Sequence, residues 1–99
     1  MEDITDLIEK AKNSLSIITS STTKDGEIEM WTKAAIADLE RQGIKAKSNL
    51  EDLLIQSAVI LFVKSNFGNT EIKEKELAEK TYSLFCTNLS LSEKYKKGT

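Results

Sequence analysis

Few residues in this 99-residue chain could take part in chemistry. The chain contains no histidine, so it can form neither a Ser-His nor a Cys-His dyad and has no imidazole to bind a metal. The single cysteine, Cys86, has no cluster of cations beside it in the sequence that would lower its pKa. Zinc would require several cysteines or histidines. We therefore interpret Cys86 as a small core residue.

Acidic residues are the remaining candidates for catalysis or for binding a cation. A general acid needs burial or a neighbouring like charge to raise its pKa. Lysines instead separate the glutamates of one polar segment, which are Glu71, Glu74, Glu76 and Glu79. The tripeptide Asp25-Gly26-Glu27 resembles a fragment of a calcium loop but lacks the ligands expected at alternate positions. We predict no catalytic residue, no metal site and no cofactor, and hence a protein that is not an enzyme.

Basic residues near the C-terminus could contact a nucleic acid. The lysines of the segment Lys94-Tyr95-Lys96-Lys97 could bind phosphates, and Tyr95 could stack on a base. Three lysines provide only a weak contact, and the whole chain has a net charge of −2 and a pI near 5.2. The composition therefore argues against a generally basic surface that binds nucleic acids.

The composition also favours an all-α fold. Proline is absent and glycine occurs only four times, so long helices can form without interruption. A chain of this length fits one domain, which we place at residues 1–99. The longest purely apolar run, 58–63, is far shorter than the roughly 20 residues that span a bilayer. The acidic N-terminus is unlike a signal peptide, and we expect an intracellular protein without membrane association.

The spacing of apolar residues predicts four helices, at about 3–16, 25–42, 49–67 and 70–91. Serine and threonine side chains predict a flexible loop at about 16–24, and the polar, basic end predicts a flexible tail at about 91–99. Leu77 and Leu84 are expected on the apolar side of the fourth helix.

Local motifs place two of the helix ends. Gly43 is expected to end the second helix in the left-handed conformation, and Ile44 stands where a Schellman motif has an apolar residue. Ser48 and Glu51 match a capping box, which predicts the start of the third helix.

The third helix, at about 49–67, is apolar on nearly all sides, so we expect it at the centre of the bundle. Three amphipathic helices can hardly cover it completely. Either the segment Ile17-Ile18 or another subunit closes the gap, and both interpretations stay open. Trp31 shares an apolar stripe with Ile28, whereas its neighbour Met30 points about 100° away and is expected to be partly exposed. Met30 is therefore a candidate partner-binding residue.

The order of these features resembles the head–tail connector proteins of long-tailed phages and prophages, also called adaptor, head-completion or DNA-packaging proteins. A short acidic helix precedes a second helix that contains Ile36-Ala37-Asp38-Leu39 and ends at Gly43-Ile44. The leucine-rich third helix closes with residues 64–68, and the fourth ends in Leu89-Ser90-Leu91-Ser92, followed by Tyr95. The resemblance covers nearly the whole chain as a pattern of helices and apolar residues. The arginine- and aspartate-rich N-terminal entry of many members is missing.

The resemblance implies a structural virion protein without catalytic residues or a cofactor. It implies self-association into a ring of about twelve copies that contacts the portal protein and a neighbouring head-completion or stopper protein. The ring would complete the DNA-filled head at the head–tail junction, after assembly in the host cytoplasm, and DNA would pass through its lumen without specific binding. The C-terminal segment would reach the partners. Besides Met30, the candidate partner-binding residues are then Leu91, Lys94, Tyr95, Lys96 and Lys97.

The same helices also fit a small intracellular adaptor or regulatory domain that dimerises or binds one partner protein. That interpretation predicts a fixed dimer or a one-to-one complex instead of a ring. A DNA-binding module would bind duplex DNA in a salt-dependent manner. An enzyme would need a deep pocket with buried carboxylates.

Overall fold

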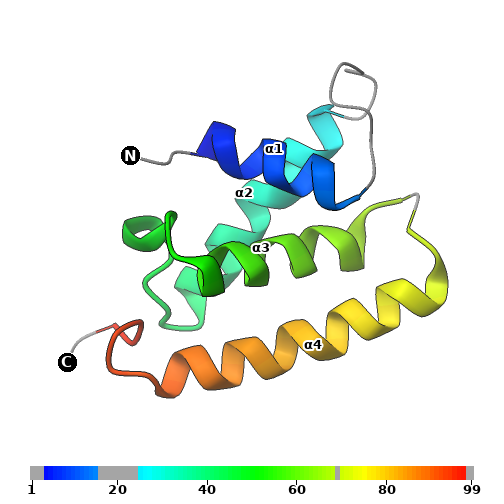
Figure 1. Cartoon of the computed structure of the whole chain (residues 1–99). Helices are drawn as coiled ribbons and strands as arrows, with labels where there is room; N and C mark the ends of the chain where they lie inside the picture. Colours follow the sequence, from blue (N-terminus) through cyan, green and yellow to red (C-terminus); the bar gives the residue numbers. More distant parts are fainter. Residues whose placement is uncertain (1–3, 16–24, 69, 98–99) are drawn as a thin grey trace.

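The chain folds into a bundle of helices in the computed structural model, which describes residues 4–15, 25–68 and 70–97 (Figure 1). In chain order the elements are α1 (Ile4–Ser14), α2 (Asp25–Arg41), the 3-10 helix η1 (Lys47–Asn49), α3 (Leu53–Asn66) and α4 (Ile72–Leu91). The described residues contain no strand, only an isolated antiparallel bridge between Ile44 and Lys96. The predicted all-α fold is confirmed.

α3 lies at the centre of the bundle, with α4 antiparallel to it on one side and α1 and α2 on the other (Figure 1). The apolar residues of α3 that are buried are Ile55, Ala58, Val59 and Val63. They belong to one cluster with fully buried residues of the flanking helices, such as Leu7 of α1 and Leu39 of α2. Burying a side chain of this size contributes about 1.5–3 kcal/mol. The described helices thus share one core around α3, as its apolar pattern predicted.

The end of α2 follows its local sequence. Gly43 has a φ of 85°, the left-handed region in which glycine is favoured. The Gly43 amide donates to the Glu40 carbonyl at 3.0 Å, and the Ile44 amide donates to the Leu39 carbonyl at 3.0 Å. These two bonds define a Schellman motif, and Ile44 and Leu39 are both completely buried. The predicted helix end is confirmed.

The start of α3 differs from the prediction. Ser48 is exposed and belongs to η1, and α3 begins only at Leu53. Asp52 is the residue that caps α3, because its carboxylate accepts from the amides of Leu54 at 2.8 Å and Ile55 at 3.4 Å. The predicted capping box at Ser48 was therefore wrong, and the central helix is shorter than about 49–67. The Glu40 carboxylate accepts from the amides of Ala46 and Lys47, both at 2.8 Å, and so holds the chain in the tighter turn before α3.

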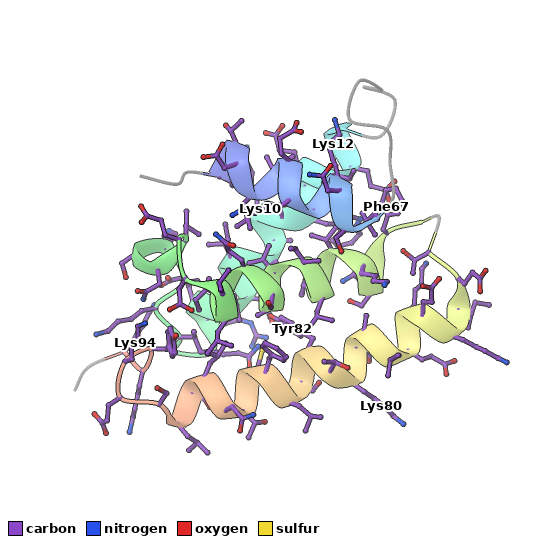
Figure 2. The ribbon with its side chains drawn as sticks, viewed as in Figure 1. Lys10, Lys12, Phe67, Lys80, Tyr82 and Lys94 are labelled. Atoms are coloured by element: carbon purple, nitrogen blue, oxygen red, sulfur yellow. The ribbon has the colours of Figure 1, made fainter. Side chains whose placement is uncertain are left out.

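The buried side of α4 also differs from the prediction. Ala78, Tyr82, Cys86 and Leu89 face the core, whereas Leu77 and Leu84 are each 65% exposed. Tyr82 selects this orientation, because its hydroxyl donates to Asp38 at 2.6 Å and its ring packs against Phe62 with 5.3 Å between centroids. In Figure 2, Tyr82 points from α4 toward α3, and Lys80 points away from it. The interpretation of Cys86 as a buried core residue is confirmed.

Two segments carry a sequence prediction of flexibility. The loop at about 16–24, which includes Ile17-Ile18, lies outside the described residues. α4 continues to Leu91, and residues 92–97 fold back beside the connection between α2 and α3 (Figure 1). This second segment lies within the flexible tail predicted at about 91–99; its backbone hydrogen-bonds to the body, and Tyr95 is only 5% exposed.

Candidate protein-binding surfaces

The outer side of α4 carries a row of exposed leucines. Leu77, Leu84 and Leu91 recur every seven residues and are 65%, 65% and 75% exposed. A spacing of seven keeps residues on one side of a helix, as in helices that pack against a second helix. We call these three residues the leucine stripe. Because exposed aliphatic groups gain free energy when they leave water, the stripe is a candidate surface for a partner chain.

A shallow depression of about 550 Å³ runs beside Leu84 on the same side of α4. Its other lining residues are polar or charged, namely Glu76, Glu79, Lys80, Ser83 and Thr87. All of them come from α4, so the depression lies between side chains that stand out from a single helix. An apolar row flanked by charges is the usual surface of a helix that packs on another protein.

A second concave surface lies where α1, α2 and η1 meet. It has a volume of about 520 Å³, and its apolar residues are Ile4, Ile36, Ala37 and Leu50. Lys33, Glu40 and Lys47 also line it. We call this surface the α1–α2 groove. A lining of apolar and charged residues is typical of a site that binds a side chain or helix of another protein.

The C-terminal segment, residues 92–97, is held against the body by what we call the C-terminal clasp. The Lys45 amide donates to the Tyr95 carbonyl at 2.7 Å, and the Lys97 amide donates to the Gly43 carbonyl at 2.8 Å. On the side chains, Asp52 accepts from the Tyr95 hydroxyl at 2.7 Å and from Lys94 Nζ at 2.8 Å. The clasp therefore provides hydrogen-bond partners for both backbone and side-chain groups of the segment.

Two carboxylates anchor the clasp, and both are stabilised in their charged form. Burial disfavours the charge on Asp52, but hydrogen bonds from Lys94, Tyr95 and the α3 amides outweigh it and lower the pKa of Asp52 to about 2. Burial likewise opposes the charge on Glu40, and hydrogen bonds from the Lys47 amide and from Lys97 lower the pKa of this carboxylate. The Lys97 ammonium lies 2.7 Å from Glu40. These bonds link the segment to the ends of α2 and α3.

The residues predicted to bind partners lie in different environments. Met30 is 52% exposed on α2, and Leu91 is the last member of the leucine stripe. Lys94, Lys96 and Lys97 are exposed, but Lys94 and Lys97 form the ion pairs of the clasp, and Lys96 forms the backbone bridge to Ile44. The ring of Tyr95 is buried, so it cannot contact a partner while the clasp is closed. The structure thus brings the tail residues together but leaves Met30 apart on α2.

Two groups that could act in catalysis, the Cys86 thiol and the Tyr82 hydroxyl, belong to buried residues. Burial raises the pKa of the Cys86 thiol, whose sulfur accepts a hydrogen bond from Gln42 at 3.5 Å. Burial, and then the hydrogen bond to Asp38, raise the pKa of Tyr82. Across residues 4–15, 25–68 and 70–97, no group of three or more His, Cys, Asp or Glu side chains could hold a metal ion. None of the helices in these ranges is long and apolar enough to cross a membrane.

The sequence interpretation missed two of these surfaces. Leu77 and Leu84 were assigned to the core, although their spacing of seven with Leu91 is a signal of a separate apolar side. The α1–α2 groove combines residues from three elements, and no local pattern marks it. Asp52 was also missed, although aspartate directly before an apolar run is a common N-cap.

Comparison with known proteins matches the chain to one family. A scan against models of protein families matches residues 7–96 to the family described as phage connector protein. The match includes all of α2, α3 and α4 and most of the C-terminal clasp. Searches of curated proteins and of solved structures found no match.

Proposed function

The chain belongs to the phage connector protein family, and we propose that it is a structural subunit of a ring that joins the head of a tailed phage or prophage to its tail. The observation that carries this proposal is the family match, which covers residues 7–96. A connector of this kind acts by binding the proteins above and below it, and this role requires no catalysed reaction.

Self-association is supported by the exposed apolar surfaces. The leucine stripe and the α1–α2 groove are both on the outside of the subunit. A ring of about twelve copies would cover such surfaces between neighbours. The ring would then lie against the portal protein and a head-completion or stopper protein, complete the DNA-filled head, and be assembled in the host cytoplasm.

The charge of the subunit suits passage of DNA through the ring. Affinity for phosphates comes mainly from lysine and arginine side chains. This chain has a net charge of −2, and two of its tail lysines, Lys94 and Lys97, are paired with carboxylates of the body. DNA would therefore pass through the lumen without specific binding. Met30 and the exposed lysines of the C-terminal segment remain candidates for contact with the portal.

A second candidate function is a small adaptor that dimerises. The leucine stripe favours this alternative as well, because a single helix with leucines every seven residues can pair with the same helix of another copy. The dimer would have two-fold symmetry and would bury the stripe completely.

The test is the mass of the purified protein by light scattering, over a range of concentrations, alone and with the portal protein. A connector subunit is expected to be monomeric or weakly associating alone and to form a ring-sized complex with the portal. A dimer whose mass does not depend on concentration, and which ignores the portal, would reject the connector proposal in favour of the adaptor.

A further inference from the structure

We propose that neighbouring copies associate head to tail, with the leucine stripe of α4 on one copy docked in the α1–α2 groove of the next. The inference rests on the proposed ring and identifies the two surfaces that would form its subunit contact. The occupant of the groove is thus a second copy of this chain. Three observations support this contact: the positions of the two surfaces, their charges and their apolar residues.

The two surfaces lie on different sides of the molecule. α3 packs between α4 and the pair of helices α1 and α2, although Tyr82 of α4 reaches Asp38 of α2 (Figure 1). The leucine stripe is exposed, whereas a different side of α4, which carries Tyr82, is buried against the bundle. A subunit can therefore offer its stripe to one neighbour and its groove to another at the same time. Such a heterologous contact repeats from copy to copy and produces a ring when the rotation closes.

The charges of the two surfaces are complementary. The depression beside Leu84 is lined by two acids and one base: Glu76, Glu79 and Lys80. The α1–α2 groove is lined by two bases and one acid: Lys33, Lys47 and Glu40. Lys33 is paired with Glu29 at 2.8 Å and Glu40 with Lys97 at 2.7 Å, so the excess positive charge of the groove comes from Lys47. Complementary charges around an apolar centre align two proteins and exclude wrong pairings. In a symmetric pairing of α4 with α4, each copy would instead present the same two acids and one base to an identical set.

The apolar residues are also suited to one another. Leu84 lies at the middle of the stripe, with Leu77 and Leu91 two helical turns away on either side. The groove offers the half-buried Leu50 and the exposed Ala37, which is small enough to let a helix approach closely, whereas Ile36 beneath them is only 6% exposed. Each leucine transferred from water into such a groove adds to the association. Leu84 against Ala37 is therefore the expected centre of the contact.

The contact can be tested with cysteines and a short bis-maleimide crosslinker. The background is Cys86→Ala, which removes the buried native thiol, with helicity checked by circular dichroism. Single variants carry Ala37→Cys, Leu84→Cys or, as a control outside both surfaces, Leu53→Cys, which replaces a leucine that is 75% exposed. All three sites are on the surface, so the fold should be kept.

The proposal predicts crosslinks between Ala37→Cys and Leu84→Cys chains in a mixture, at least about tenfold more than either forms with Leu53→Cys. A chain with both cysteines should form a ladder of oligomers. Crosslinks of Leu84→Cys with itself, at the expense of the mixed product, would overturn the proposal and indicate a symmetric dimer. Lack of the mixed product both in free protein at high concentration and on the portal would overturn it as well.

Charge reversal provides a second measurement. Glu79→Lys and Lys47→Glu should each reduce the rate of mixed crosslinking by about fivefold, and combining both changes should restore it. Loss of rate without restoration would contradict the pairing.

If the protein joins the portal as a ring but forms no mixed crosslink, only the contact is wrong. If the mixed crosslink forms but the portal is not bound, only the connector function is wrong.

Discussion

The leucine stripe and the C-terminal clasp lie close together in the sequence, yet they differ in where their interactions are satisfied. Tyr95 and Asp52 in the clasp have their hydrogen bonds made within the subunit. Leu84 and Leu91 in the stripe stay in water, with 65% and 75% of their surface exposed. Residues near a predicted binding tail can therefore differ in role. Those of the clasp stabilise the subunit itself, whereas those of the stripe remain exposed and are the ones that we propose contact a neighbouring copy.

The largest effect on the free energy of unfolding is expected for mutation of Asp52, where the clasp meets α3. Asp52→Ala removes the N-cap of α3 and leaves the buried Tyr95 hydroxyl without its acceptor, so we expect a loss of about 2–3 kcal/mol in the free energy of unfolding. Urea unfolding followed by circular dichroism measures it. Asp52→Asn is the matched control, because its side-chain oxygen can still cap the helix, and it should cost less. Equal costs for both variants would show that the charge, and not the cap, dominates.

Protonation of Asp52 at low pH should also weaken the clasp. The pKa of Asp52 is about 2 in the folded chain, below the ordinary value of 3.8 for an aspartate. A folded pKa below the unfolded one means that the charged carboxylate stabilises the fold above about pH 4, and that this contribution disappears as the pH falls toward about 2. The difference in unfolding free energy between wild type and Asp52→Asn should shrink across this range. A difference that does not change between pH 5 and pH 2 would contradict the assignment.

In contrast to the clasp, a mutation in the leucine stripe should affect association between subunits and not the stability of the single subunit. Leu84→Ser should change the free energy of unfolding by less than about 0.5 kcal/mol, because the side chain is exposed. The same change should weaken self-association or portal-bound ring formation by about tenfold, since an aliphatic group no longer leaves water. Sedimentation at several concentrations measures the association. Leu53→Ser, which changes an exposed leucine outside the stripe, is the control. If both variants weakened association equally, the stripe would not be the contact surface.

The smallest effect is expected at the edge of the clasp. The ion pair between Lys97 and Glu40 is partly exposed, and the Lys97 backbone bond to Gly43 does not need the side chain. Lys97→Ala should therefore lower the free energy of unfolding by only about 0.2–1 kcal/mol. A loss above about 2 kcal/mol, measured by urea unfolding, would mean that this ion pair, and not Asp52, holds the segment in place.

Most features that were predicted correctly depend on neighbours along the chain, although one local prediction, the capping box at Ser48, was wrong. The Schellman end of α2 needs only Gly43, Ile44 and the preceding turn, and it was predicted correctly. The all-α fold and the central position of α3 follow from apolar spacing, which is also local.

Features that depend on distant residues were predicted less well. Asp52 caps α3 while it is held by Tyr95, 43 residues away in the sequence. The orientation of α4 depends on the bond from Tyr82 to Asp38, 44 residues away, and that bond leaves Leu77 and Leu84 outside. Periodicity alone could not choose between the two apolar sides of α4, because both contain regularly spaced apolar residues. The α1–α2 groove has no signature in the sequence, because three elements form it.

The bond between the Lys97 amide and the Gly43 carbonyl has a consequence for how the chain folds. It closes a loop of more than fifty residues, which contains η1, α3 and α4. Closing such a loop costs chain entropy before its contacts stabilise the product, so it is expected to form after the helices themselves. During synthesis, Gly43 and Asp52 are made before Tyr95 and Lys97. Glu40 can hold the turn at Ala46 and Lys47 before then, and only the bonds of Gly43, Lys45 and Asp52 to residues 94–97 are expected to form last.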